Sequence, residues 1–423
     1  MPQLLIKNGL LIDPLRGESR GDLLLAGGRI SRAGRRLKAP SGCAVFDAAG
    51  LWVFPGFIDV HVHAREPGAE EAETLESAAL AAAAGGITSV LLMPNTYPPM
   101  ARPALLRKYS ARANGLPVNV YFSGAATAGR AGGKPSDLAA LKRAGARAFT
   151  DDGSCLPGVA LAGLLKKAAA LGLPLLDHPE ILKLTGAGVA APAAARRLGL
   201  PAIPPEAEAF AVLRDILAAA SYGPVHLQHL SLASSAAALR QAKKLGWPVT
   251  GETCPHYIFL SERDIKEDDA DFKMKPPLRP ESDRLALLRA VADGTIDIIA
   301  SDHAPHERRL KAKGFALAPF GITGLETMAA LCVTGLVLTK IISKLRLAQL
   351  LSANPARLLG LNNKGALSAG CDADLTIIDP RSSRRVPAEF TSRSSNSPFI
   401  GRALRCWPAA TVVGGKIVYR GIC

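Results

Sequence analysis

The residues best suited to chemistry in this chain gather in one short segment, Asp59-Val60-His61-Val62-His63. Successive side chains of a β-strand point to opposite faces, so residues two apart project together. In an extended segment, Asp59, His61 and His63 therefore share one side. Paired imidazoles are ligands that a borderline metal such as Zn²⁺ prefers. A single histidine would more simply be a hydrogen-bonded core residue, but this pair favours a metal site.

Other histidines and aspartates also stand where β-rich runs end. His178 ends one run, His229 ends the next, and Asp151 and Asp152 directly follow another. Asp302 lies just beyond a further run. If the strands are parallel and form a barrel, their carboxyl ends all open to one mouth, where active sites lie. We therefore predict a mononuclear or binuclear metal site built from four histidines and two aspartates.

This convergence requires a regular series of strands, and the central part of the chain supplies one. Short β-rich runs alternate with Ala/Leu-rich helical stretches such as Gly158–Leu171 and Glu206–Ser221. The alternation indicates parallel strands with crossover helices, and eight strands close a (β/α)8 TIM barrel. The eight predicted strands are Phe57–His61, Ile87–Leu92, Pro117–Phe122, Ala146–Thr150, Pro174–His178, Pro224–His229, Pro248–Thr253 and Ile296–Ser301.

The two ends of the chain have a different pattern. Leu4–Arg35 alternates β-rich pieces with turns, and the tail resumes this pattern at Asp374–Ile378 and Ala410–Tyr419. We predict that both ends pair into one small β-sandwich domain of antiparallel strands. The predicted division is 1–53 for the first part of the sandwich, 54–362 for the metal-binding barrel and 363–423 for the second part.

Composition excludes several classes of protein. The 423 residues carry a formal net charge of +15, but the basic residues are scattered and only 5% of residues are aromatic, which argues against nucleic-acid binding. The seven cysteines contain no C-x-x-C pair, as expected in a reducing cytoplasm. The segment between Glu326 and Lys340 is too short to cross a membrane and predicts a buried helix. We expect a cytoplasmic protein that binds neither nucleic acid nor membrane.

Taken together and in order, the motifs resemble those of the amidohydrolase superfamily, and within it the type I dihydroorotase family. The resemblance covers essentially the whole chain. It rests on Asp59–His63, Arg65–Gly68, Met93–Thr96, Thr150–Gly153, His178, His229, Pro276–Arg279, Ser301–His306, Pro319–Ile322 and Asp372–Leu375.

The resemblance implies one or two Zn²⁺ ions per chain. His61, His63 and Asp302 would bind one ion, and His178 and His229 the second. Asp151 would bridge the two, because no lysine stands here to form the carboxylated bridge of related hydantoinases. Asp152 is the alternative carboxylate.

The implied reaction is the reversible cyclisation of N-carbamoyl-L-aspartate to L-dihydroorotate in pyrimidine biosynthesis. Asp302 would be general base and then acid. Arg65 could bind the substrate carboxylate through two parallel N–H···O hydrogen bonds. The implied substrate-binding residues are His63, Arg65, Asn95, Lys275, His306, Phe320 and Gly321.

Two positions depart from the family pattern. Lys275 replaces the usual Asn before Pro-Pro-Leu-Arg, at a substrate-binding position, and either supplies a cationic donor or alters specificity. Pro179 follows His178 in place of Cys and removes a backbone donor beside a ligand, which could shift the metal geometry.

Two alternatives follow. Another cyclic amidohydrolase, such as a hydantoinase or allantoinase, rests on Lys275 alone. A non-catalytic subunit that scaffolds aspartate carbamoyltransferase would typically have lost metal ligands, whereas all six positions are retained here. Aspartate carbamoyltransferase remains a possible partner of an active enzyme, and we expect a homo-oligomer.

Overall fold

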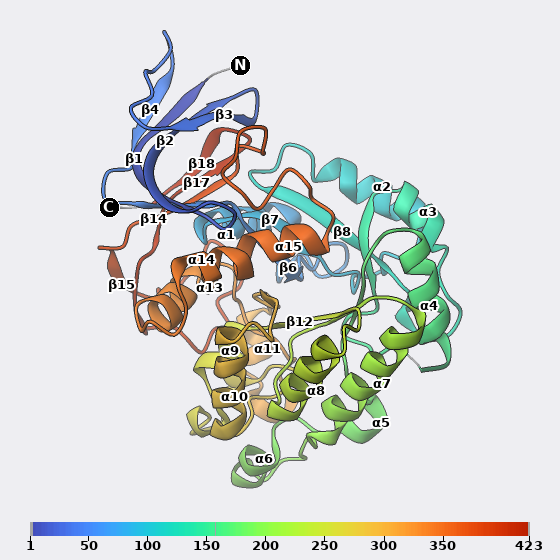
Figure 1. The fold of residues 1–423 in the computed structure, drawn as a ribbon. Helices are drawn as coiled ribbons and strands as arrows, with labels where there is room; N and C mark the ends of the chain where they lie inside the picture. The colour runs from blue at the N-terminus through green and yellow to red at the C-terminus, as the bar shows by residue number, and fades with distance from the viewer. Residues whose placement is uncertain (1–2, 157, 422–423) are drawn as a thin grey trace.

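A parallel β-barrel forms the centre of the computed structural model, which describes residues 3–156 and 158–421 (Figure 1). Its eight strands are neighbours in chain order, and parallel bridges from His303 to Val62 and Ile322 bring the last strand back toward the first. The predicted TIM barrel is confirmed. Its strands are β6 (Phe57–Val62), β7 (Ile87–Leu92), β8 (Asn119–Ala125), β9 (Ala146–Thr150), β10 (Leu175–Asp177), β11 (Val225–Leu227), β12 (Val249–Thr253) and β13 (Ile298–Ile299).

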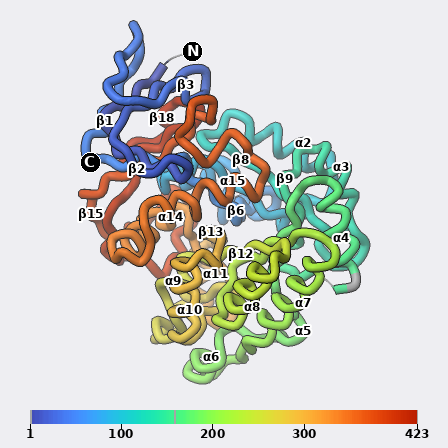
Figure 2. The backbone as a smooth tube through the Cα atoms, viewed as in Figure 1, coloured from blue at the N-terminus to red at the C-terminus, as the bar shows by residue number. Residues whose placement is uncertain are grey.

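Helices cover the outside of this barrel (Figures 1 and 2). All six residues of β6 are buried, as expected for a parallel strand covered on both faces. The helices are α1 (Leu75–Ala84), α2 (Pro103–Arg112), α3 (Leu138–Arg143), α4 (Gly158–Ala170), α5 (Leu182–Thr185), α6 (Pro192–Leu198), α7 (Glu206–Tyr222), α8 (Ala233–Lys244), α9 (Pro255–Phe259), α10 (Glu281–Ala292), α11 (Arg308–Lys311), α12 (Gly314–Leu317), α13 (Met328–Cys332), α14 (Lys344–Ala348) and α15 (Asn354–Leu358).

Local sequence explains how some of these elements begin and end. Thr74 caps α1 by accepting a hydrogen bond from the Ser77 backbone N–H, and the Ser77 side chain returns the bond in a capping box. The buried helix expected between Glu326 and Lys340 is present as α13, which continues into a π-helical segment, Val333–Val337.

The two ends of the chain meet in one sheet beside the barrel, as predicted (Figure 1). Strands β5 and β14 join the ends by antiparallel pairing. The prediction that all these strands are antiparallel is wrong, because β1 pairs in parallel with β4 and β5, and the sheet is mixed. The sheet contains β1 (Leu4–Asp13), β2 (Gly17–Ala26), β3 (Arg29–Gly34), β4 (Ala44–Asp47), β5 (Trp52–Pro55), β14 (Leu375–Ile378), β17 (Pro408–Val413) and β18 (Lys416–Arg420), while β15 (Ser383–Arg385) pairs separately with β16 (Ala403–Arg405).

The sheet of the two ends has its own apolar core and is hydrogen-bonded to the barrel. Leu23, Val53 and Ile377 lie in that core. At the junction, the Thr376 hydroxyl donates to the Gly86 carbonyl oxygen at 2.6 Å and accepts from the Phe57 backbone N–H at 3.0 Å. Within the described residues, none of the helices is both long and apolar enough to cross a membrane.

Candidate metal centre

The first group of possible ligands comes from β6 and β13, the first and the last strand of the barrel. His61 and His63 stand at the end of β6, and their ring centroids lie 5.4 Å apart. Asp302 follows β13, and its Oδ1 lies 3.5 Å from His61 Nε2 and 3.2 Å from His63 Nε2. These three buried side chains could hold one metal ion.

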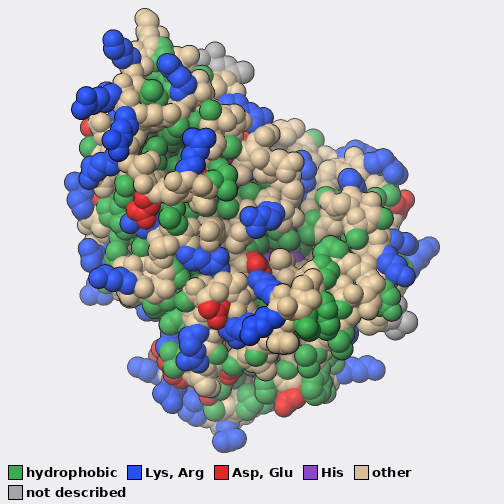
Figure 3. All heavy atoms as spheres, viewed as in Figure 1, with side chains coloured by type: hydrophobic (Ala, Val, Ile, Leu, Met, Phe, Trp, Pro, Cys, Tyr) green, Lys and Arg blue, Asp and Glu red, His purple; other side chains and the backbone are tan. Residues whose placement is uncertain are grey.

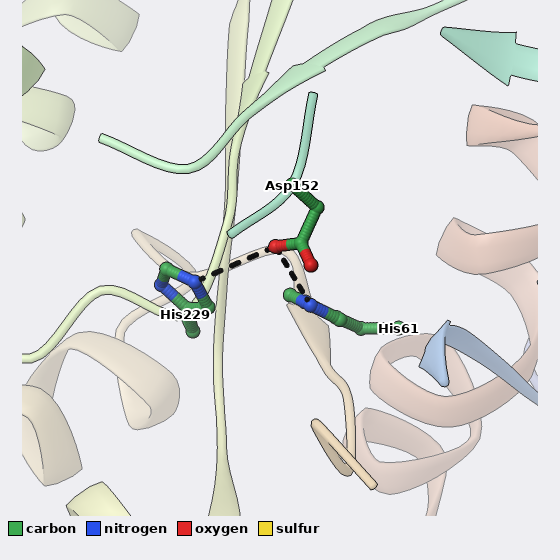
Figure 4. Close-up of side chains that lie close together, drawn as sticks. All are labelled: His61, Asp152 and His229. Atoms are coloured by element: carbon green, nitrogen blue, oxygen red, sulfur yellow. Dashed lines mark ion pairs between the residues drawn. The ribbon is translucent and has the colours of Figure 1, made fainter. Parts of the chain in front are cut away.

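The second group is built around Asp152, which follows β9. Its Oδ1 lies 3.2 Å from His61 Nε2, 3.5 Å from His178 Nδ1 and 3.9 Å from His229 Nε2. Figure 4 shows this carboxylate between the His61 and His229 rings. Its Oδ2 lies 3.5 Å from His63 Nε2, so Asp152 faces all four imidazoles.

Asp151, the expected bridge, faces another way. Its Oδ1 accepts a hydrogen bond from the Thr127 backbone N–H at 3.0 Å, and its Oδ2 accepts one from the Thr127 hydroxyl. The Asp152 N–H donates to the Thr150 hydroxyl at 3.0 Å, a local turn that directs Asp152 to the centre. The geometry favours Asp152, the alternative that the sequence left open.

Strands β10 and β11 end earlier than predicted, so His178 and His229 lie in the loops just beyond them. His229 Nε2 lies 2.7 Å from His178 Nδ1. His229 has φ +35°, Asp302 has φ +46° and Arg65 has φ +58°. Left-handed backbone is uncommon for residues other than glycine and is often found at functional sites. At His229, Asp302 and Arg65 the positive φ interrupts the extended backbone, and the side chains lie at the centre or its cavity.

The donor set fits a bound cation. His61 Nε2 is buried and lacks a hydrogen-bond partner among the described residues, although two carboxylates face it. Burial, together with the neighbouring His178 and His61, lowers the pKa of His229 to about 3, which favours the neutral imidazole that binds metals. Burial by itself raises the pKa of Asp302, but His61 and His63 outweigh it and lower that pKa below its usual value.

Three hydrogen bonds orient the histidines from behind, and sequence reasoning missed two of the partners. Glu252 Oε1 lies 2.7 Å from His61 Nδ1, and Glu180 Oε2 lies 3.0 Å from His178 Nε2. Asn95 Oδ1 lies 2.9 Å from His63 Nδ1. Such partners hold the proton on one ring nitrogen and leave the other free for metal. The available signals were the spacing of Glu180 two residues after His178 and the place of Glu252 near the carboxyl end of a predicted strand.

A cavity of about 340 Å³ opens over the centre. Arg65 donates from Nε to the Pro305 carbonyl oxygen at 3.0 Å, and its Nη2 lies 3.2 Å from His306 Nε2. His306 Nε2 also lies 2.7 Å from the Phe320 carbonyl oxygen. The lining residues are His63, Arg65, Asn95, Asp152, Gly153, His178, His229, Lys275, Asp302, Ala304, Pro319, Phe320 and Gly321.

Lys275 and Pro179, the two positions that depart from the family pattern, have different surroundings. Lys275 lines the cavity, and its Nζ lies 3.0 Å from Glu180 Oε2, so it is linked through Glu180 to His178. Gly321 also lines the cavity, but its backbone N–H donates to the Lys273 carbonyl oxygen at 3.0 Å. Pro179 is buried beside His178.

Comparison with known proteins defines the class first. A model of the amidohydrolase family matches residues 52–418, and the chain belongs to that family. Among solved structures, L-hydantoinase (dihydropyrimidinase) from Arthrobacter aurescens matches this chain with a TM-score of 0.90 at 25% identity. The match covers 99% of this chain and 96% of the hydantoinase chain. Dihydropyrimidinase from Brevibacillus agri, at 24% identity and a TM-score of 0.86, shares the fold.

Relatives in sequence narrow the class. Dihydroorotase from Pelotomaculum thermopropionicum is 43% identical over 98% of both chains. Dihydroorotases from Geobacillus sp. (41%, 99% of both chains) and Bacillus caldolyticus (44%, 89% of both chains) are similar. Within the amidohydrolases, the chain is therefore a member of the dihydroorotases, as its motifs predict.

Proposed function

We propose that this chain interconverts L-dihydroorotate and N-carbamoyl-L-aspartate with Zn²⁺ held by the buried centre. The observation that carries the proposal is the convergence of four imidazoles and two carboxylates beneath a cavity lined by Arg65 and Lys275. Imidazole and carboxylate ligands suit zinc. The full-length similarity to dihydroorotases supports the choice of substrate.

The ligands divide into two sets that share Asp152. His61, His63 and Asp302 would hold one ion, and His178 and His229 would hold a second, with Asp152 between them. When bound, zinc supplies Lewis acidity to polarise a carbonyl group and lowers the pKa of water to near 7.

In this proposal Asp302 moves the proton. Its Oδ1 faces His61 and His63, which leaves Oδ2 to accept a proton from the water that attacks the ring amide carbonyl. The same carboxyl group then delivers the proton to the ring nitrogen as the carbon–nitrogen bond breaks. The reverse sequence closes the ring of N-carbamoyl-L-aspartate and releases water.

Cationic and polar groups of the cavity bind the substrate. Arg65 would pair with its carboxylate, while the Pro305 carbonyl oxygen accepts a hydrogen bond from Arg65 Nε at 3.0 Å. Asn95 is hydrogen-bonded to His63 and lines the cavity, so it can orient both a ligand and the substrate. Phe320 and Gly321 form the facing wall, and Lys275 adds a second cation.

Turnover of L-dihydroorotate by metal-stripped and zinc-replenished protein tests this function. We expect activity only with metal, and Asp302→Asn should lower kcat by about 100-fold or more, the contribution of general acid–base catalysis. Hydantoin, dihydrouracil and allantoin should be poor substrates in the same assay. A metal-replete protein that leaves L-dihydroorotate intact, or prefers one of the other rings, would contradict the proposal.

A further inference from the structure

Lys311 is a buried cation outside the set of residues discussed so far. It ends α11 and retains only 6% of its accessible surface, whereas Arg308, Arg309 and Lys313 of the same basic segment are exposed. Within the described residues it forms no ion pair with a carboxylate. Burial lowers the pKa of Lys311 to about 8, although Asp271 and Asp269 favour its charge and Lys273 opposes it. A lysine that is desolvated at such cost needs a compensating set of contacts.

Its contacts are three backbone carbonyl groups. Nζ donates to the carbonyl oxygens of Gly321 at 2.9 Å, Pro319 at 3.2 Å and Lys273 at 3.3 Å. An ammonium group has three N–H donors, so each oxygen can receive one. The three carbonyls belong to two separate segments, and Lys311 therefore ties those segments together.

Both segments form the wall of the substrate cavity. Pro319, Phe320 and Gly321 line it directly, and Lys273 lies two residues before the lining residue Lys275. The Gly321 N–H donates to the same Lys273 carbonyl oxygen at 3.0 Å. Lys273 Nζ also lies 4.6 Å from the centroid of the Phe320 ring.

Gly321 belongs to one of the two tied segments and has a backbone conformation and a close contact that only glycine accommodates. Its φ is +132°, and a Cβ here would lie 2.6 Å from Ala304 Cβ. Asn396 Nδ2 donates to the Gly321 carbonyl oxygen at 2.9 Å, so this oxygen receives one donor from Asn396 and one from Lys311. The Gly321 carbonyl oxygen is therefore held by two side chains that do not line the cavity.

We propose that Lys311 is a positioning residue for the substrate: from behind the cavity wall it fixes the Pro319–Gly321 segment against Lys273, and so sets the place of Phe320 and Lys275. Its role as a substrate-positioning group rests on the proposed function. Because Lys311 contacts none of the proposed metal ligands, its removal should change substrate binding without changing metal content.

Three variants test this role in the zinc-loaded protein. Lys311→Met keeps the apolar stem and removes the donors, Lys311→Arg keeps the charge in a different shape, and Lys313→Met is the exposed control. Loss of charged hydrogen bonds should raise KM for L-dihydroorotate about tenfold in Lys311→Met, with kcat within about threefold of wild type. Lys311→Arg should recover part of the loss, and Lys313→Met should match wild type. Zinc content should be equal in all four proteins.

Hydrogen exchange at the Gly321 amide gives a readout that does not depend on turnover. Exchange should be faster in Lys311→Met than in wild type and unchanged in Lys313→Met. If Lys311→Met does not fold, Lys311→Arg decides by the same two measurements, with a smaller rise in KM and in exchange. Unchanged KM and unchanged exchange would overturn the positioning role. A wild-type protein without dihydroorotate turnover would overturn the proposed function, while exchange would still decide whether Lys311 holds this segment.

Discussion

Asp151 and Asp152 show how much one position matters at the scale of single residues. Both carboxylates are buried, but one accepts hydrogen bonds from Thr127 and the other faces four histidines. The alternation of side chains between the two faces of a strand cannot predict which aspartate faces the histidines, because both lie beyond the end of β9. The hydrogen bond between the Asp152 N–H and the Thr150 hydroxyl decides the orientation, and that turn depends on the folded loop.

Substituting each aspartate by asparagine should therefore separate the two roles. Asp152→Asn should weaken zinc binding by more than about 100-fold, since even residues that only orient ligands contribute about 10- to 100-fold. Asp151→Asn should keep its zinc and lose about 1–3 kcal/mol of unfolding free energy, because its contacts with Thr127 are buried. Metal analysis after dialysis against a chelator, and urea unfolding, measure these outcomes. Loss of zinc in Asp151→Asn with retention in Asp152→Asn would reverse the assignment.

The residues that orient the histidines were harder to predict than the clustering of the proposed ligands. His61, His63 and Asp302 lie in dense motifs beside predicted strands, whereas Glu252 is one acid on a strand without a motif around it. Its importance follows from the barrel geometry, which places β12 where Glu252 can contact His61 on β6 and His226 on β11. Contacts between side chains this far apart in the chain are not present in any local pattern.

At the scale of elements, periodicity predicted the existence of the strands better than their ends. All eight predicted barrel strands are present, and β7 and β9 have the predicted bounds. The predicted strands that lead to His178 and His229 were too long, and at His229 the chain leaves the extended conformation with a positive φ. The sheet of the chain ends is mixed because β1 pairs in parallel with β4 and β5, an arrangement that alternation along one strand cannot reveal.

Helix packing on the barrel depends on a close approach at the end of α1. Gly85 follows α1 with an ordinary helical φ of −79°, yet a Cβ there would lie 2.1 Å from the Leu325 carbonyl oxygen. A backbone oxygen cannot move aside as a flexible side chain does. Gly163 in α4 is the control position for Gly85, because a Cβ there would meet no other heavy atom within 4 Å.

Gly85→Ala should consequently lower the free energy of unfolding by about 1–3 kcal/mol through overpacking. Gly163→Ala should raise it by about 0.5–1 kcal/mol, the usual gain on replacing glycine inside a helix. Urea unfolding of both variants measures the difference. Equal effects of the two substitutions would mean that the contact between α1 and the segment before α13 does not restrict Gly85.

At the scale of the whole molecule, the net charge of +15 has no single location. Lys and Arg side chains are spread over the face shown in Figure 3. Arg65 and Lys275 bring part of the charge into the cavity, where an anionic substrate would meet it. Most of the basic residues lie elsewhere on the surface, and the structure does not explain them.

The joining of both chain ends to the barrel predicts how the molecule unfolds. Thr376 of β14 is fully buried, and its hydroxyl bonds Phe57 at the start of β6 and Gly86 just before β7. One side chain thus links the sheet of the chain ends to the amino ends of β6 and β7. The proposed metal centre lies at the carboxyl ends of the barrel strands. Thr334 makes an equivalent pair of hydrogen bonds with the Arg405 backbone at the exposed surface.

Thr376→Val keeps the shape of the side chain but leaves a buried N–H and a buried carbonyl without this partner. We expect a loss of about 2–4 kcal/mol of unfolding free energy, against less than about 1 kcal/mol for Thr334→Val, where water can replace the bonds. Trp52 in β5 and Trp247 before β12 should report one shared urea transition in both variants, because the sheet and the barrel share this buried junction. The kcat of Thr376→Val should stay at the wild-type value where the protein is folded, since the junction lies away from Asp302. Separate transitions for Trp52 and Trp247 in the wild-type protein would show instead that the chain ends fold independently of the barrel.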